Sequence, residues 1–216
     1  MQTDADAGAT GDLAPDLPFG IDFGGSGIKG APVDLEVGDF AAKRTRVDTP
    51  QPATPEAVAR VMRDVVGAYP ESSAPVGVTV PGVVQHGLVK SAANIDPVWL
   101  GQDADAVITE ALGREVHVVN DADAAGLAEV RYGAAAGHRG LVILTTLGTG
   151  IGSAMVHDGV LVPNSELGHL PLHGGDAEKW AANSVCEYFD LSWSDWAERV
   201  TSTSTLWRTC SGPTCS

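Results

Sequence analysis

The sequence predicts an α/β protein made of two related halves, and three observations support this fold class. Strand-like and helix-like segments alternate along the chain. A glycine-rich hairpin pattern occurs twice, as FGIDFGGSGIKGAPVDLEVGDF from residue 19 and as LVILTTLGTGIGSAMVHDGVLVPN from residue 141. A short strand of buried type, residues 116–119, ends on the polar pair Asn120-Asp121. The internal repeat indicates two α/β halves that face a shared cleft, with their boundary near residue 120.

The first half is expected to begin with three strands. Residues 19–23 predict a strand, the glycines after them a tight turn, and residues 28–35 the returning strand. A third strand is expected over residues 40–47, after a turn in EVGD.

A helix is predicted next, in the stretch ATPEAVARVMRDVVGAYP. Thr54 can cap its amino end, and Pro55 suits the first helical position. The apolar residues that follow recur at helical spacing and form one stripe: Val58, Val61, Met62, Val65 and Val66.

The chain then continues to alternate up to the second hairpin pattern. Glycines follow both of the later helices, in the position that glycine commonly takes past a helix end. In order, we expect a strand over 76–80, a Pro81-Gly82 turn, a hairpin about His86-Gly87, a helix over 103–112 before Gly113, the strand 116–119 and a helix over 122–132 before Gly133.

Composition excludes several classes of function. The 216 residues include 28 Asp and Glu but only 13 Lys and Arg, a net charge of −15, which argues against nucleic-acid and membrane-surface binding. The three cysteines form no CxxC pair, so a reduced cytoplasm is the expected location. Residues 1–17 lack the pattern of a signal peptide and are expected to be a disordered tail. No apolar run approaches the roughly 20 residues that span a bilayer.

The two glycine-rich turns, residues 24–30 and 148–152, suit phosphate binding, because backbone N–H groups can approach phosphate oxygens where no Cβ obstructs them. Alternatively, the glycines only shape hairpins. Neither turn is a Walker loop, because GxxxxGK(S/T) is absent, and neither is a Rossmann fingerprint, because each leads into a strand rather than a helix.

Polar residues at two places are candidates for chemistry. Asn120 and Asp121 follow a strand, where α/β enzymes place catalytic groups, but they can equally cap the next helix. Glu166 and His169, three residues apart in NSELGHL, can hydrogen-bond adjacent hydroxyls of a sugar, or belong to a solvated loop. The other histidines show no metal-binding spacing with a cysteine.

In order and combination, seven stretches resemble the ROK sugar kinases of the actin-like ATPase (ribonuclease H-like) superfamily, and within them the actinobacterial polyphosphate glucokinases. The family phosphorylates the 6-hydroxyl of glucose with polyphosphate or ATP and Mg²⁺. The resemblance therefore implies an actin-like ATPase fold and this activity. The stretches are FGIDFGGSGIKG, TPQPATP, GVTVPGVV, SAANID, NDADAAGLAEVRYGA, LGTGIGSA and PNSELGHL.

The same resemblance implies the roles of individual residues. Asp121 matches the general base that deprotonates the sugar hydroxyl, and it lies in the sugar site. The sugar-binding positions match Asn94, Asn120, Glu166, His169 and Glu178. The phosphate-binding positions match Gly24, Gly25, Ser26, Gly27 and Lys29 in the first turn, and Gly148, Thr149 and Gly150 in the second.

The chain departs from the family pattern in two places. It lacks the cysteine-rich CxCGxxGC motif of many members, so no zinc or other structural metal is expected. After about residue 200 the sequence leaves the family pattern, as a frameshift or an early stop would produce. We therefore expect domains at 18–119 and 120–200, the second incomplete, followed by an aberrant tail at 201–216.

Polyphosphate requires a track of cations. The partners implied are glucose, with mannose as a second acceptor, polyphosphate or ATP, and a second copy of the chain in a homodimer. An inactive remnant of such a kinase and a sugar-responsive regulator of the ROK type remain alternatives. The candidate cations for the polyphosphate track are Lys29, Lys43, Arg44, Arg46, Arg131 and Arg139.

Overall fold

The structure is a computed structural model that describes residues 16–92 and 95–210. The chain divides into two compact units, one ending at Asn120 and the other beginning at Asp121. The division lies one residue from the boundary that the repeat predicts. The predicted tail, residues 1–17, falls almost entirely outside the described residues.

The first unit is built on a mixed sheet with strand order β3-β2-β1-β5-β8. β1 (Phe19–Phe23) pairs antiparallel with β2 (Gly27–Asp34) and parallel with β5 (Val76–Val80), which pairs parallel with β8 (Val116–Asn120). β1 therefore lies inside the sheet with a partner on each side, and its alternating buried and more exposed residues show that one face of it packs the core.

The third strand expected over residues 40–47 is wrong as one element. It is split into β3 (Asp39–Phe40) and β4 (Thr45–Asp48), which pair with opposite ends of β2. The Tyr69 side chain occupies the break: its hydroxyl accepts a hydrogen bond from the Thr45 N–H at 2.8 Å and lies 2.6 Å from the Lys43 carbonyl oxygen. A side chain distant in sequence thus replaces backbone pairing here.

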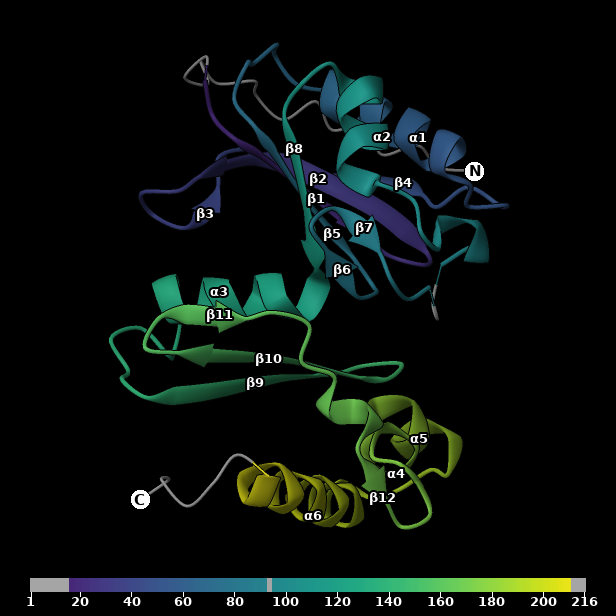
Figure 1. Ribbon diagram of the computed structural model, residues 1–216, viewed down its shortest axis with the longest axis vertical. Helices are drawn as coiled ribbons and strands as arrows, with labels where there is room; N and C mark the ends of the chain where they lie inside the picture. The colour runs from purple at the N-terminus through teal and green to yellow at the C-terminus, as the bar shows by residue number, and fades with distance from the viewer. Residues whose placement is uncertain (1–15, 93–94, 211–216) are drawn as a thin grey trace. The chain divides into compact units, whose positions relative to one another are not determined.

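Helices α1 (Pro55–Gly67) and α2 (Ala104–Leu112) cover one face of this sheet (Figure 1). The predicted caps are confirmed: the Thr54 side chain accepts from the Ala57 N–H, and Gly113 is left-handed with φ of 64°. Between the helices and the sheet lies a continuous apolar core that includes the fully buried Trp99.

Short elements complete the first unit. The predicted hairpin about His86-Gly87 is formed by β6 (Val84–Gln85) and β7 (Leu88–Val89), with both turn residues at positive φ. The 3-10 helix η1 (Pro97–Trp99) then places Trp99 in the core, where its indole N–H donates to the Ala53 carbonyl at 2.8 Å.

The second unit begins with α3 (Asp121–Tyr132), which packs on an antiparallel sheet of order β11-β10-β9 (Figure 1). The sheet comprises β9 (Leu141–Leu147), β10 (Ile151–His157) and β11 (Val160–Val162). Gly126 allows close packing, since a Cβ there would lie 2.5 Å from the Ala154 Cβ.

Short elements and a long helix follow the sheet. Packed against Ile151 are the buried Ala181, Ala182 and Trp207, and the Trp207 indole donates to the Leu167 carbonyl at 3.1 Å. The elements are η2 (Leu167–His169), β12 (Pro171–Leu172), β13 (Gly175–Asp176), α4 (Glu178–Ala181), α5 (Asn183–Tyr188) and α6 (Trp193–Cys210).

The predicted domain end at residue 200 falls inside α6. Thr201, Thr203 and Thr205 are poor helix formers, but each hydroxyl donates to the carbonyl four residues earlier, at 2.8–2.9 Å. Burial of Trp207 then holds this part of the helix against the unit. Tertiary packing overrides the weak local propensity of the segment.

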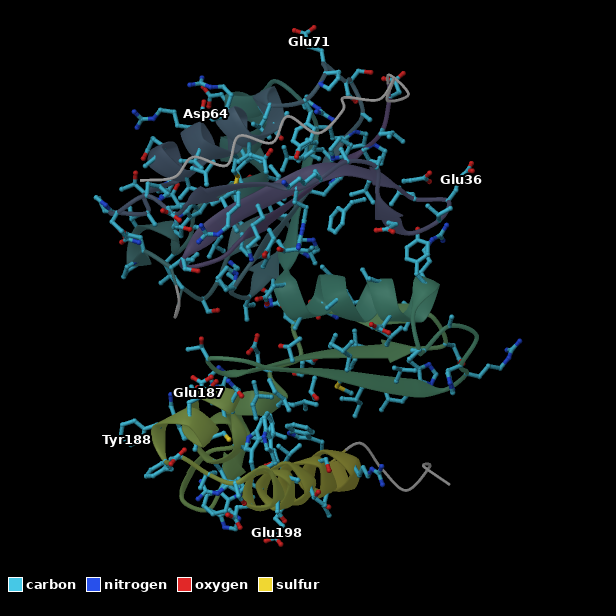
Figure 2. The ribbon with its side chains drawn as sticks, turned by 180° about the vertical axis from the view of Figure 1, so that it is seen from behind. Glu36, Asp64, Glu71, Glu187, Tyr188 and Glu198 are labelled. Atoms are coloured by element: carbon cyan, nitrogen blue, oxygen red, sulfur yellow. The ribbon has the colours of Figure 1, made fainter. Side chains whose placement is uncertain are left out.

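The acidic excess lies largely on the surface. Glu36, Asp64, Glu71 and Glu198 all project outward in Figure 2. Within residues 16–92 and 95–210, no helix is both long and apolar enough to cross a membrane.

Candidate functional site

The first glycine-rich turn joins β1 to β2 and is closed by its own backbone. The Gly24 N–H donates to the Gly27 carbonyl at 3.0 Å. The Thr49 hydroxyl, from the end of β4, donates to the Gly24 carbonyl at 2.6 Å and anchors the turn. Gly25 and Ser26 are exposed at its tip. The turn is therefore anchored by Thr49 and exposed to solvent at its tip, as an anion-binding loop requires.

A polar row crosses the sheet beside this turn. In register, Lys29 on β2 lies opposite Asp22 on β1, which lies opposite Thr79 on β5. The Lys29 ammonium is 3.6 Å from the Asp22 carboxylate, and the Thr79 hydroxyl donates to that carboxylate at 3.1 Å. Neither Asp22 nor Thr79 was predicted from the sequence. The available signal for Asp22 in the sequence was its position, two residues before Gly24.

The second glycine-rich turn joins β9 to β10 in the same manner. The Gly148 N–H donates to the Gly150 carbonyl at 3.0 Å. Ser184, at the start of α5, donates its N–H to the Gly148 carbonyl at 3.2 Å and its hydroxyl to the Thr149 carbonyl at 2.6 Å. The predicted residues of this turn are thus fixed by a helix that the sequence analysis did not connect to it.

The dipeptide Asn120-Asp121 marks the point where β8 becomes α3. Asn120 is buried, and its side-chain amide donates to the Gly82 carbonyl at 3.1 Å, which ties the strand end to the Pro81-Gly82 turn. The Asp121 carboxylate accepts from the Ala122 N–H at 2.8 Å, in the first turn of α3. Asp121 thus pairs with a backbone N–H of the first helical turn, while the catalytic interpretation of the pair stays a prediction.

The loop that carries Glu166 is held firmly. The buried Ser153 hydroxyl donates to the Ser165 carbonyl at 2.6 Å and accepts from the Leu167 N–H at 2.9 Å. Gly168 is buried, and a Cβ there would lie 2.3 Å from the Ile151 carbonyl oxygen. Strand β10 therefore sets the position of Glu166 on both sides of that residue.

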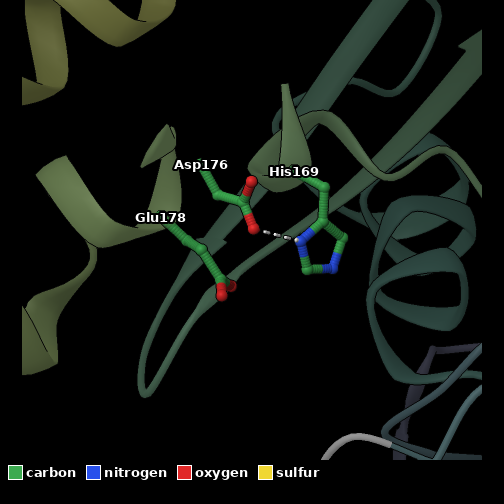
Figure 3. Close-up of side chains that lie close together, drawn as sticks. All are labelled: His169, Asp176 and Glu178. Atoms are coloured by element: carbon green, nitrogen blue, oxygen red, sulfur yellow. Dashed lines mark hydrogen bonds and ion pairs between the residues drawn. The ribbon is translucent and has the colours of Figure 1, made fainter. Parts of the chain in front are cut away.

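Four side chains converge in the second unit, three of them in Figure 3. His169 lies between two carboxylates: its Nδ1 is 3.3 Å from Asp176 and its Nε2 is 3.6 Å from Glu166. The Glu178 carboxylate is close to the second turn, where it accepts from the Ile151 N–H at 3.4 Å. The predicted residues Glu166, His169 and Glu178 are thus brought together. Asp176, which was not predicted from the sequence, lies in β13 and belongs to the same cluster.

Negative charge accumulates around this cluster. Burial is the main cause that raises the pKa of Glu166, and nearby Asp123, Asp121 and Glu178 raise it further, while His169 opposes them. Burial also raises the pKa of Asp123, whose carboxylate accepts from the Asn164 N–H at 2.8 Å. Perturbed carboxyl groups that share one region are typical of functional sites.

The cluster also has the donor set of a metal site. Ligand atoms of His169, Asp176 and Glu178 all lie within 4.8 Å of one another. This group was not predicted from the sequence, where only histidine–cysteine spacings were considered as metal ligands. The expectation of no metal stays a prediction.

The remaining predicted residues belong to the first unit or fall outside the structure. Gly24, Gly25, Ser26, Gly27 and Lys29 form the first turn and the start of β2, and Asn120 ends β8. Asn94 lies outside the described residues.

The family follows from comparison with known sequences. Residues 18–189 match the ROK family. The chain is 53% identical to the polyphosphate glucokinase of Mycobacterium tuberculosis, over 85% of this chain and 69% of the relative. It is 52% identical to that of Mycobacterium leprae, over 85% of this chain and 56% of the relative. The chain therefore belongs to the ROK family.

Solved structures agree with this assignment. The polyphosphate/ATP-glucomannokinase of an Arthrobacter strain matches with a TM-score of 0.80 and 54% identity, over 86% of this chain and 76% of that one. A ROK glucokinase from Streptomyces griseus, solved with glucose and AMPPNP, matches with a TM-score of 0.67 and 27% identity, over 80% of this chain and 59% of that one. The predicted α/β fold of the actin-like ATPase type is confirmed.

Proposed function

We propose that this protein transfers a phosphoryl group from polyphosphate, or from ATP, to the 6-hydroxyl of glucose. The observation that carries the proposal is the grouping of Glu166, His169 and Glu178 beside the second glycine turn, in the unit that begins with Asp121. The similarity to polyphosphate glucokinases supports the choice of donor and acceptor.

The cluster suits a sugar better than an apolar ligand. Carboxylates accept hydrogen bonds from hydroxyl groups, and an imidazole can donate or accept according to its tautomer. Asp176, hydrogen-bonded to Nδ1 of His169, favours the tautomer that carries its proton there. Nε2 then faces the Glu166 carboxylate at 3.6 Å, so the two groups are placed to hydrogen-bond neighbouring sugar hydroxyls.

Asp121 supplies the base. It accepts the proton of the 6-hydroxyl while that oxygen attacks the terminal phosphorus of the donor, and the bond to the bridging oxygen breaks as the shortened donor leaves. A base positioned in this manner contributes about 10²–10⁴ in rate. The backbone N–H groups of the glycine turns suit the donor phosphates.

Mg²⁺ is the expected cofactor, and the residues beside the first turn fit it. Mg²⁺ prefers oxygen ligands, and Asp22 presents a half-exposed carboxylate with the Thr79 hydroxyl next to it. Asp22 would therefore hold the ion, directly or through water. When bound, Mg²⁺ neutralises charge on the phosphates.

The primary test is formation of glucose 6-phosphate by purified protein with Mg²⁺, with polyphosphate and ATP supplied in parallel. Asp121→Asn keeps the size of the side chain but removes the base, and we expect at least a 100-fold loss of product. Equal activity in the variant would disprove the role of Asp121. No product from folded wild-type protein would leave the alternative, a remnant without catalysis.

A thermal melt with and without glucose separates these outcomes. A ligand that binds only the native state raises its apparent stability. A glucose-dependent shift that persists in Asp121→Asn and disappears in Glu178→Gln would support the sugar site. Mannose as second acceptor, a homodimer and a cytoplasmic location are further predictions of the same proposal.

A further inference from the structure

Arg46, on β4, lies over the first glycine-rich turn. Its guanidinium donates to the Ser26 carbonyl at 3.1 Å and forms an ion pair with Asp48 at 2.7 Å. A Cβ at Gly27 would lie 2.9 Å from the guanidinium, so the glycine provides the space for this position. Arg46 is one of the six cations that the sequence offers as candidates for a polyphosphate track.

The sheet register extends the polar row to Arg46. Arg46 lies directly opposite Lys29, which lies opposite Asp22. Side chains of directly paired residues point to the same face, and here that face is opposite to the one that packs the core. Two cations from neighbouring strands are thus adjacent at the base of the turn.

Arg46 retains capacity for an anion. Its side chain is 51% exposed, and the contacts with Ser26 and Asp48 use two of the five N–H donors of a guanidinium. The planar fork suits phosphate better than a single ammonium does. Arg44, which was also predicted as a cation of the track, is no longer assigned to it, because its guanidinium packs over the Phe40 ring, 5.0 Å from the centroid.

We propose that Arg46, together with Lys29, binds a phosphate of the donor beside the first turn and favours polyphosphate over ATP. The inference rests on the proposed function for the nature of the donor. A long polyphosphate chain can occupy the turn and these two cations at once, whereas the phosphates of ATP end at a nucleoside. Arg46 should therefore matter more for polyphosphate.

The Asp48→Asn variant distinguishes phosphate binding by Arg46 from a purely structural role, because the two roles predict opposite effects on donor binding. If the Arg46–Asp48 ion pair only holds the turn, then Asp48→Asn should weaken donor binding as much as loss of Arg46. If Arg46 binds phosphate, removal of the competing carboxylate should leave polyphosphate binding unchanged or make it tighter. The two variants thus separate the roles by sign.

The test is equilibrium binding of fluorescently labelled polyphosphate to the full chain, with ATP binding measured alongside. We expect Arg46→Gln to weaken polyphosphate binding roughly fivefold, the loss of one exposed charge-assisted contact, and ATP binding less than twofold. Arg44→Gln, the matched control, should change neither. Arg46→Lys, which keeps the charge but loses the fork, should give an intermediate loss and serves if Arg46→Gln does not fold.

Several results would overturn the inference. They are unchanged binding in Arg46→Gln, an equal loss in Arg44→Gln, an equal loss for ATP, a matching loss in Asp48→Asn, or no polyphosphate binding by the wild-type chain. Because the readout is binding, the inference can hold even if the chain forms no glucose 6-phosphate, and it can fail while the kinase activity stands.

Discussion

Each unit contains a hairpin with a glycine-rich turn, but the two hairpins are packed differently. In both, a glycine turn is closed by one backbone hydrogen bond of 3.0 Å, from Gly24 to Gly27 and from Gly148 to Gly150. β1, however, has a strand on each side and buries Phe19, while β9 pairs only with β10 in the described chain and has no fully buried residue. Local sequence sets the turn, whereas sheet position sets how much the hairpin contributes to stability.

The largest expected effect tests this contrast in burial. Phe23 on β1 is 1% exposed and contacts Trp99, so Phe23→Ala should lower the free energy of unfolding by about 3–5 kcal/mol. Ile143 on β9 is half-buried, so Ile143→Ala should cost about 1 kcal/mol. Chemical denaturation of both variants measures the difference. Equal losses would show that β9 is as well packed as β1.

A second comparison separates packing glycines from binding glycines. A methyl group at Gly168 would collide with the Ile151 backbone, so Gly168→Ala should cost about 1–3 kcal/mol. Nothing lies within 4 Å of a Cβ at Gly148, so Gly148→Ala should fold normally but raise the KM for the phosphoryl donor. Thermal melts and donor titrations check the pair. A normal KM in Gly148→Ala would argue that this glycine only shapes the hairpin.

A third prediction concerns the support of the sugar cluster. Ser153→Ala removes the buried hydroxyl that holds the Glu166 loop, and we expect a loss of about 1–2 kcal/mol with a raised KM for glucose. Ser184→Ala, the control, removes an exposed hydroxyl bonded to Thr149 and should leave the glucose KM unchanged. If the glucose KM rises equally in both variants, Ser153 has no specific role in positioning the cluster.

The smallest expected effect is a pH dependence of the second unit. The pKa of Glu166 is raised above its ordinary value of 4.5 by burial, so the folded state binds the proton more tightly than the unfolded state. Stability should therefore fall as pH rises from about 4.5 through the raised pKa. Denaturation midpoints between pH 4 and 8 should show a shallower fall in Glu166→Gln. Asp123, whose pKa burial also raises, contributes a fall in the same direction. An unchanged slope in the variant would contradict this assignment.

Elements with strong local signals were predicted well from the sequence. The stripe of α1 with its Thr54 cap and the strand over residues 76–80 agree with the structure, because spacing and capping are properties of short segments. The segment 40–47 failed because the break depends on the Tyr69 hydroxyl, which is distant along the chain.

The residues of the candidate site likewise fall into two groups: those that a local pattern predicts and those that only tertiary contacts identify. Glu166 and His169 could be recognised, being three residues apart in one loop. Asp176 could not be grouped with them, because the turn between β12 and β13 brings it to His169. Ser153, Ser184 and Thr79 act through hydrogen bonds to residues between 12 and 57 positions away, and no local pattern marks them.

The sequence by itself therefore determined the elements with strong local signals, the two glycine turns and the placement of Asp121 at the end of a strand, since these follow from period, capping and turn chemistry. Only the tertiary structure decided that Arg46, Lys29, Asp22 and Thr79 form one row, because strand register is set by pairing across the whole sheet. It likewise decided that the threonine-rich end of α6 is helical, since burial of Trp207 outweighs weak propensity.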